Sequence, residues 1–528
     1  MRSIEIPQPE DRDWRYRAFE ILPGALTWTI LSLPIILSLI NPKLVAYFVI
    51  TFLLVWFVRV LAIAVRSIQG WNRMAQHQKL AWQKLNDDLE ILQANAKNAP
   101  KWHAHNLARV EKYIAHNRIK PSEVYHAVIV CFWNESRDVL EPTIQSVINS
   151  HYDLKKMILI MAYEQRGGPE IEALANSLVK DFGHHFYHAE AVMHPWPMTG
   201  EIIGKGGNAT FAGRHLKKYL EELKIKPEHV LVTTLDADNR PDKQYFGALT
   251  YTYCSTEEPK YASYQPVPMY LNNIWDAPAP MRVIATGNSF WNLTLSLRPH
   301  ILRNFSAHAQ PMSALIDTDF WSVRTIVEDG HQFWRTYFRY DGKHDVYPIY
   351  VPIYQDAVLS ESYKKTLRAQ FRQIQRWAWG ASDIAYVFYN GFLKPNNIPR
   401  HKMIAKFMRL LESHVSWSTT PLILLFAAYP PFLLNPQSYL ASQLPHMVSW
   451  IQRALMAGIL VSLFLSMRSL PPKPERYKRR RSVWMVLQWV YLPLTTIIYS
   501  SFAAIYSQTR LMFGWYLGWV ITEKAVKK

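Results

Sequence analysis

The sequence predicts an α/β domain, built on a parallel sheet, that is inserted between two groups of membrane-spanning helices. Long stretches without formal charge lie near both ends of the 528-residue chain. The middle instead repeats a short apolar strand, a polar loop and a helix, which is typical of a parallel sheet with helices on both faces. The mean hydropathy of −0.11 is too low for a chain of membrane helices alone, so the chain has two regions of different character.

Composition excludes several classes of protein. Apolar residues make up 49% of the chain, with 20 Trp and 29 Tyr, which excludes an intrinsically disordered protein. Two cysteines, Cys131 and Cys254, exclude a disulfide scaffold and a four-cysteine zinc site, and they fit a reducing compartment. The net charge is +18. Because many of the basic residues flank apolar stretches, they favour contact with anionic membrane lipids over nucleic acid.

A transmembrane hairpin is expected over residues 21–65, after a cytoplasmic N-terminus of residues 1–20. Ile21 to Ile40 carries no charge, and after a short turn the stretch from Leu44 to Val65 is interrupted only by Arg59. About 20 apolar residues span a bilayer core. A cleaved signal peptide is the alternative, but a long segment of mixed charge precedes the first stretch and a second span follows at once. Arg59 is expected near the inner end of its helix, where its side chain can reach headgroups.

Residues 401–510 are expected to form about three more spans by the same length criterion. The loop 468–481 between the last two holds seven basic residues, whereas the loop 435–446 holds none. The positive-inside rule places the basic loop, and with it the whole segment between the two groups of spans, in the cytoplasm. Three spans would leave the tail 511–528 outside, yet its three lysines favour the inside. We expect an interfacial, cytoplasmic tail and a location in the bacterial inner (plasma) membrane.

Between the spans, residues 66–120 are expected to form juxtamembrane helices and residues 121–400 the α/β domain. Three apolar strands of this domain end in polar residues: the first at Asn134-Glu135, the second at Tyr163-Glu164 and the third at Asp236-Ala237-Asp238. In parallel sheets, ligands bind at the carboxyl ends of the strands. We therefore expect the functional site at this edge.

Asp236 and Asp238 are the candidate metal ligands. Carboxylates two residues apart at a strand end can hold Mg²⁺ or Mn²⁺ and leave coordination sites for a diphosphate. The ion would act as a Lewis acid on a leaving nucleotide. A second such triplet, Asp317-Thr318-Asp319, has no preceding strand, so a loop or helix-cap role is favoured for it.

Three further groups are candidates for chemistry. Glu328-Asp329 could supply a general base, or simply cap a helix. Gln373, Arg376 and Trp377 lie in a helical stretch that could clamp phosphate and stack on a sugar, or form an amphipathic interface helix. Lys205, in a glycine-rich turn ahead of a helix, could contact phosphate, although the Walker A pattern is absent.

In their order along residues 121–400, these signals resemble the family 2 glycosyltransferases, in particular the membrane-embedded branch that includes cellulose and hyaluronan synthases. The resemblance implies a GT-A (Rossmann-like) fold, a nucleotide-sugar donor, Mg²⁺ or Mn²⁺, and inversion at the anomeric carbon. The sequence departs from the family pattern at Tyr163-Glu164 and at Val327. The segment 265–350 is also dense in Pro, Trp and Tyr, which indicates an unusual acceptor surface, so the specificity of the named synthases is not carried over.

The resemblance also implies roles for individual residues. Asn134, Glu135, Glu164 and Lys205 would line the donor pocket, with Asp236 and Asp238 at the diphosphate and its metal, Asp329 (beside Glu328) as catalytic base, and Arg376, Gln373 and Trp377 at the diphosphate and acceptor. The expected activity is transfer of a hexose-type unit to a polysaccharide or lipid-linked acceptor at the cytoplasmic face, processive and with export, for which a partner export subunit is possible. The alternatives are single transfer to a polyprenyl phosphate and, from other classes, a nucleotide-binding membrane transporter or a receptor-like sugar-binding protein without turnover.

Overall fold

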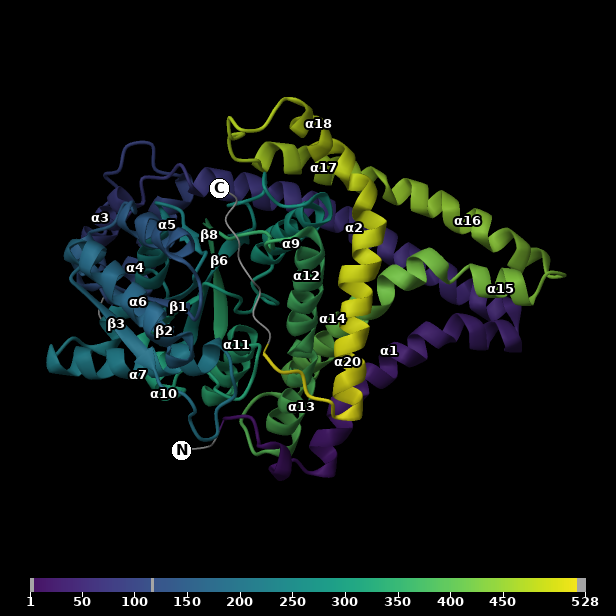
Figure 1. Cartoon of the computed structure of the whole chain (residues 1–528), viewed down its shortest axis with the longest axis horizontal. Helices are drawn as coiled ribbons and strands as arrows, with labels where there is room; N and C mark the ends of the chain where they lie inside the picture. The colour runs from purple at the N-terminus through teal and green to yellow at the C-terminus, as the bar shows by residue number, and fades with distance from the viewer. Residues whose placement is uncertain (1–3, 115–117, 520–528) are drawn as a thin grey trace.

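The computed structural model describes residues 4–114 and 118–519 and shows an α/β domain packed against long apolar helices (Figure 1). An eight-stranded sheet forms the centre of the domain, and the apolar helices come from both ends of the chain. The predicted fold class, an α/β domain between apolar terminal helices, is confirmed. The strands are β1 (Tyr125–Phe132), β2 (Met157–Glu164), β3 (His188–His194), β4 (Val230–Asp236), β5 (Arg240–Pro241), β6 (Ala262–Met269), β7 (Ala309–Pro311) and β8 (Asp345–Tyr354).

The sheet is mixed, so the prediction of a parallel sheet is right for one half and wrong for the other. Its order is β3-β2-β1-β4-β7-β6-β8-β5, and the first four strands are parallel. Strand β7 runs antiparallel to both β4 and β6, while β8 is parallel to β6. Prolines explain why the second half was missed: Pro266 and Pro268 lie in β6, where proline normally argues against a strand.

Alternation along β1 attaches helices to both faces of the sheet, as predicted. Ala127 and Ile129 share a core with α7, whereas Val128 and Val130 share a core with α5. All four side chains are fully buried. Because successive residues of a strand point to opposite faces, one short apolar stretch supports both layers.

The helices fall into three groups: those before the domain, those within it and those that follow it (Figure 1). Within residues 66–120, α2 ends at His77 and α3 and α4 follow and pack on the domain; that these helices are juxtamembrane stays a prediction. The helices are α1 (Trp14–Ile40), α2 (Pro42–His77), α3 (Trp82–Ile91), α4 (Lys101–Tyr113), α5 (Arg137–Ile148), α6 (Gly168–Phe182), α7 (Lys205–Glu222), α8 (Tyr245–Cys254), α9 (Ala279–Ser296), α10 (Met312–Asp317), α11 (Glu328–Arg339), α12 (Tyr363–Ala378), α13 (Asp383–Phe388), α14 (Arg400–Phe426), α15 (Tyr429–Leu434), α16 (Tyr439–Leu455), α17 (Ala457–Ser469), α18 (Arg480–Leu487), α19 (Leu492–Thr495) and α20 (Ala503–Phe513).

Three helices of the described chain are long and apolar enough to cross a membrane: α1, α2, and the continuous helix 480–513 that runs from α18 to α20. Helix α2 has 36 residues, about 54 Å at 1.5 Å per residue, so it exceeds the ~30 Å hydrocarbon core and continues towards the sheet domain. From α14 through α17 the chain forms four separate helices. The number of spans there stays a prediction, and so does the side of the tail, whose lysines 524, 527 and 528 lie outside the described residues.

A glycine in the first turn of α7 permits the close packing next to the predicted site. A Cβ at Gly206 would lie 2.2 Å from the Ser322 carbonyl oxygen and 3.2 Å from the Cβ of Glu328. Contact with a backbone oxygen cannot be relieved by a rotamer change. The glycine therefore fixes how closely α7 approaches the loop at Ser322 and the start of α11.

We expect Gly206→Ala to lower the free energy of unfolding by about 1–3 kcal/mol, because the added methyl group forces α7 away from the loop at Ser322. Gly287→Ala is the matched control: no atom lies within 4 Å of a Cβ at that position in α9, and the change should raise stability by about 0.4–1 kcal/mol. Thermal unfolding followed by tryptophan fluorescence measures both. Equal stability of the two variants would contradict this packing.

Candidate active site

The carboxyl ends of β1, β2 and β4 meet at one edge of the sheet, as the sequence predicted. Backbone pairing places Cys131 of β1 beside Asp236 of β4, and Phe132 beside Tyr163 of β2. The polar residues that end these strands are therefore neighbours in space although they are far apart in the sequence.

Lys205 is the centre of a buried group of charges at this edge. It is the first residue of α7, and its Nζ lies 2.8 Å from Asp236 Oδ1 and 3.6 Å from Asp329 Oδ1. Only 8% of its side chain is exposed. Burial alone would lower the pKa of Lys205, but the Asp236 and Asp329 carboxylates outweigh it and hold that pKa well above its usual range. Lys205 is therefore a permanent cation that joins two candidate acids.

The adjacent acids Glu328 and Asp329 begin α11 but have different environments. Burial and the neighbouring Asp329 raise the pKa of Glu328 to about 8, so it is mostly neutral at pH 7. The Asp329 side chain is 20% exposed, whereas Glu328 is only 3% exposed. The Oδ1 of Asp329 is itself buried and faces Lys205 and His308. The remaining, exposed part of this carboxyl group can be reached by a substrate hydroxyl, so Asp329 fits the role of base better than Glu328.

His308 borders Asp329 and is held in its neutral form. Its Nδ1 donates to the Phe305 carbonyl oxygen at 3.0 Å, while its Nε2 accepts from Trp321 Nε1 at 3.2 Å. Burial lowers the pKa of His308. Its Nδ1 also lies 3.6 Å from Asp329 Oδ1, so the ring packs directly beside that carboxylate.

The two candidate metal ligands, Asp236 and Asp238, end the strand β4 and the turn after it. Asp236 Oδ2 accepts a hydrogen bond from Ser306 Oγ at 2.7 Å, and Asp238 Oδ2 accepts one from the Asp356 amide at 3.0 Å. Within residues 4–114 and 118–519, no group of three or more His, Cys, Asp or Glu is arranged to hold a metal. Two carboxylates still fit Mg²⁺ or Mn²⁺ when the remaining ligands are water and phosphate oxygens, which is usual for Mg²⁺.

Helix α12 brings Arg376 and Trp377 to the same site. Burial lowers the pKa of Arg376, and the nearby charges of Glu328, Asp236 and Asp329 act against this. The Arg376 guanidinium lies 4.2 Å from the ring of Trp519, in the segment after α20. Gln373, one turn earlier on α12, accepts a hydrogen bond from Gln370 at 3.1 Å.

Two aromatic residues also border the site next to Arg376 and Trp377. The sequence analysis did not single them out. Trp519 also covers the start of α7, because a Cβ at Gly204 would lie 3.5 Å from its ring. Tyr270 lies 6.1 Å from Trp377 between ring centres, and burial, followed by Asp236, Asp238 and Asp329, raises its pKa. The density of Trp and Tyr in 265–350 was the only signal for Tyr270, and nothing in the sequence marked Trp519.

The ends of β1 and β2 form a second, adjacent part of the site. Glu135 Oε2 accepts from the amides of Trp133 at 2.8 Å and Asn134 at 3.1 Å, so it stabilises the loop that carries Asn134. Glu164 accepts from Arg166 Nε at 2.7 Å, and burial raises the pKa of this glutamate. The Arg166 guanidinium in turn lies 5.2 Å from the Trp133 ring. This arrangement offers planar groups and acceptors to a nucleoside.

The second acidic triplet lies outside the site. Asp317 pairs with Lys260 at 2.7 Å, and Asp319 pairs with Arg214 at 2.8 Å. The Asp319 side chain is 68% exposed. The preference for Asp236-Ala237-Asp238 over this triplet agrees with the geometry.

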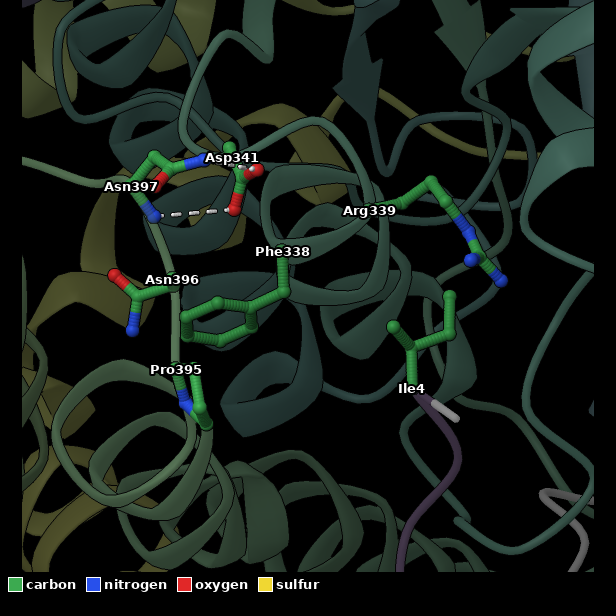
Figure 2. A pocket seen from close by; sticks show the side chains of 7 residues that line it. All are labelled: Ile4, Phe338, Arg339, Asp341, Pro395, Asn396 and Asn397. Carbon is green, nitrogen blue, oxygen red and sulfur yellow. Dashed lines mark hydrogen bonds between the residues drawn. The ribbon is translucent and has the colours of Figure 1, made fainter. Parts of the chain in front are cut away.

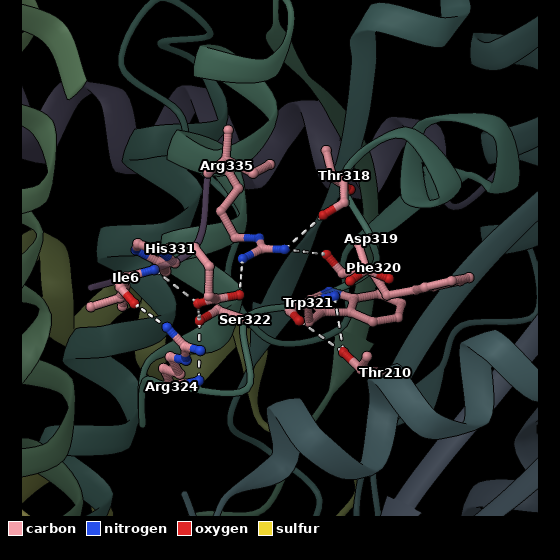
Figure 3. Close-up of polar contacts among 12 residues, drawn as sticks. Ile6, Thr210, Thr318, Asp319, Phe320, Trp321, Ser322, Arg324, His331 and Arg335 are labelled. Carbon is pink, nitrogen blue, oxygen red and sulfur yellow. Dashed lines mark hydrogen bonds and ion pairs between the residues drawn. The ribbon is translucent and has the colours of Figure 1, made fainter. Parts of the chain in front are cut away.

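The N-terminal segment anchors α11, the helix that carries Glu328 and Asp329. Glu5 forms an ion pair with Arg335 of α11 and also accepts from Ser322 Oγ. Arg335 donates to the Thr318 carbonyl oxygen at 2.6 Å, and Arg324 donates to that of Ile6 at 2.9 Å (Figure 3). Residues that precede the first apolar helix thus help to position the candidate base.

A separate pocket of about 290 cubic ångströms contains none of the predicted site residues (Figure 2). It lies between the end of α11 and the loop before α14, where Asp341 accepts from Asn397 Nδ2 at 3.4 Å.

No protein-family model and no curated sequence match the chain. Several solved structures are similar to it at low identity. A mannosyltransferase of Pyrobaculum calidifontis in complex with GDP-Man and Mn²⁺ is 13% identical, covers 84% of this chain and 98% of its own, and gives a TM-score of 0.39. S. aureus TarS 1–349 in complex with UDP-GlcNAc is 11% identical, with 74% and 93% covered and a TM-score of 0.36. GalNAc-T7 with UDP, GalNAc and Mn²⁺ is 10% identical, with 57% and 58% covered and a TM-score of 0.32.

The raised pKa of Glu328 predicts how stability depends on pH. Between the ordinary value of 4.5 and about 8, the folded protein keeps a proton that the unfolded chain releases, so raising the pH lowers the free energy of unfolding. Glu328→Gln cannot ionise and should escape this loss. The difference in Tm between Glu328→Gln and wild type should therefore increase from pH 5 to pH 8, whereas the exposed control Glu475→Gln should follow wild type. If the plots of Tm against pH for Glu328→Gln and wild type are parallel, Glu328 is not a buried, neutral acid in the folded protein.

Proposed function

We propose that the chain is a membrane-bound, GT-A-type glycosyltransferase of the family 2 kind. It transfers a sugar from a nucleotide-sugar donor to a polysaccharide or lipid-linked acceptor at the cytoplasmic face. The observation that supports this most strongly is the convergence of Lys205, Asp236, Asp329 and Arg376 at one sheet edge. Such a transfer needs positive charge beside the diphosphate, which Lys205 and Arg376 can supply. It also needs a carboxylate that can accept the proton of a hydroxyl, which Asp329 can supply.

The donor would lie across the carboxyl ends of β1, β2 and β4. Asn134, Glu135 and Glu164 would contact the nucleoside, and Lys205 and Arg376 would neutralise the diphosphate. Asp236 and Asp238 would hold Mg²⁺ or Mn²⁺, which when bound supplies positive charge to the leaving nucleotide.

In the proposed reaction, Asp329 accepts the proton of the acceptor hydroxyl as its oxygen attacks the anomeric carbon. The bond from that carbon to the diphosphate oxygen breaks, and the nucleoside diphosphate leaves with the electron pair. Attack opposite the leaving group inverts the anomeric centre. Lys205 and Arg376 stabilise the charge that develops on the diphosphate. Because Glu328 is neutral, it adds no second negative charge beside the base.

The acceptor would approach along α12, where Trp377 and Tyr270 offer ring faces to a sugar. Helix α12 also contacts the long apolar helix at the C-terminal end, since Ser507 Oγ donates to the Gln375 carbonyl oxygen at 2.7 Å. A direct contact between the acceptor side and a candidate span favours processive synthesis with export over a single transfer to a polyprenyl phosphate. The products tell these apart by their length on a gel.

Loss of the base tests the mechanism. Asp329→Asn should lower release of nucleoside diphosphate by about 10²–10⁴-fold, because a positioned general base contributes that much. Asp319→Asn is the matched control: it removes an exposed carboxylate of the second triplet and should leave turnover unchanged. Transfer by Asp329→Asn near the wild-type rate would show that another group takes the proton.

A further inference from the structure

A groove of about 510 cubic ångströms runs along α2 where this helix faces α14. Its walls are mostly aromatic and aliphatic, and the residues that matter here are Tyr47, Phe48, Phe52, Val55, Trp56 and Arg59. From Tyr47 to Arg59 the helix rises about 18 Å, more than half of a ~30 Å hydrocarbon core. The groove is therefore long enough for a substantial part of a lipid chain.

An ion pair closes one end of the groove. Arg59 Nη1 of α2 lies 2.6 Å from Glu412 Oε1 of α14, and both side chains are nearly half exposed, at 45% and 47%. The Arg59 guanidinium also lies 5.1 Å from the Trp56 ring. The apolar groove thus ends at a polar bridge between the two helices.

Beyond this bridge lies an arginine cluster, formed by Arg66 of α2, Arg298 after α9 and Arg409 of α14. On α2, Arg66 lies two turns after Arg59, and on α14, Arg409 lies one turn before Glu412, so both extend the faces that the Arg59–Glu412 pair joins. Burial lowers the pKa of Arg298, and the positive charges of Arg66, Arg409 and Arg59 lower it further. The Glu412 carboxylate acts on Arg298 in the opposite direction, but it is already paired with Arg59. The cluster therefore carries an excess of positive charge.

Packing between α2 and α9 brings this cluster together. A Cβ at Gly70 would lie 2.7 Å from the Leu293 carbonyl oxygen, and Ser67 Oγ lies 3.2 Å from Thr294 Oγ1. Arg66 precedes this contact on α2, and Arg298 follows it after α9. A loop of the sheet domain thus contributes a cation to a surface that is otherwise formed by apolar helices.

The surface around the cluster is apolar and exposed. Val58, Leu61 and Val65 of α2 are 64%, 43% and 54% exposed, and Met408 of α14 is 53% exposed. Cations next to exposed aliphatic side chains match the boundary between lipid headgroups and acyl chains.

We propose that the groove and the arginine cluster form a binding site for one anionic phospholipid. Its phosphate contacts Arg66, Arg298 and Arg409, and one acyl chain lies along the groove. Arginine suits this role because its guanidinium donates paired hydrogen bonds to phosphate oxygens. The inference is independent of glycosyl transfer, because it rests on charge and shape at a surface that the reaction does not use.

The test measures lipid retention by the full chain. Purified protein is reconstituted in nanodiscs of phosphatidylcholine with 20% phosphatidylglycerol, released into detergent, and examined by native mass spectrometry. Wild type should retain one phosphatidylglycerol in preference to phosphatidylcholine. Arg298→Gln with Arg409→Gln should weaken retention about 20- to 30-fold, the effect of two juxtamembrane cations.

Two further variants make the result specific. Lys478→Gln with Arg479→Gln removes the same charge from the exposed basic loop before α18 and should retain phosphatidylglycerol within about twofold of wild type. Val55→Trp fills the groove without a change of charge and should also lose the lipid. Since Val55 is 47% exposed, this variant tests the site even if the double arginine variant does not fold.

Several outcomes would overturn the proposal. One is that the loop variant loses as much phosphatidylglycerol as Arg298→Gln with Arg409→Gln. Another is that this double variant or Val55→Trp retains phosphatidylglycerol as well as wild type does. A third is that wild type shows no preference for phosphatidylglycerol over phosphatidylcholine. Retention of an added polyprenyl phosphate in place of phosphatidylglycerol, or a dimer that buries the groove, would likewise identify a different occupant. Since the assay needs no donor or acceptor, its result is separate from that of the transfer assays.

Discussion

The buried contact of Lys205 with Asp236 and Asp329 is the interaction on which the site depends. It joins the first residue of α7, the end of β4 and the start of α11, with Nζ–Oδ1 distances of 2.8 and 3.6 Å. Without this cation, the Asp236 and Asp329 carboxylates would lie near each other with no positive charge between them, which is unfavourable in a partly desolvated space. The same ammonium that organises the packing therefore also places a positive charge beside the candidate base.

The contact also explains how the chain balances charge near a diphosphate site. Asp236, Asp329 and Glu328 lie close together, and burial resolves the crowding by keeping Glu328 neutral while Lys205 and Arg376 compensate the others. A donor would bring two or more negative charges to this place. Lys205 of α7 and Arg376 of α12 are already in place to interact with these negative charges before the donor binds. This is the preorganisation that electrostatic catalysis requires.

Much of this site could be predicted because its residues follow regular strands or lie on regular helices. Asn134, Glu164 and Asp236 were predicted from the apolar strands that precede them, and Arg376 from the helical pattern of α12. Only the family resemblance favoured Asp329 over Glu328; the local pattern could not separate them, because their difference is one of burial, which no local pattern encodes. Ser306, His308 and Trp519 were missed for a related reason: they lie in irregular segments and reach the site only through tertiary packing. The prolines of β6 hid the antiparallel half of the sheet in the same way.

The most direct test of the account is a donor screen. Solubilised wild-type protein is offered each common nucleotide sugar in turn, with Mg²⁺, with Mn²⁺ or with EDTA, and the release of UDP or GDP is measured. The account predicts that at least one donor releases its nucleoside diphosphate at a rate that depends on the divalent cation. Binding of nucleoside diphosphates without turnover of any donor would contradict it, since the charges around Lys205 would then serve recognition alone.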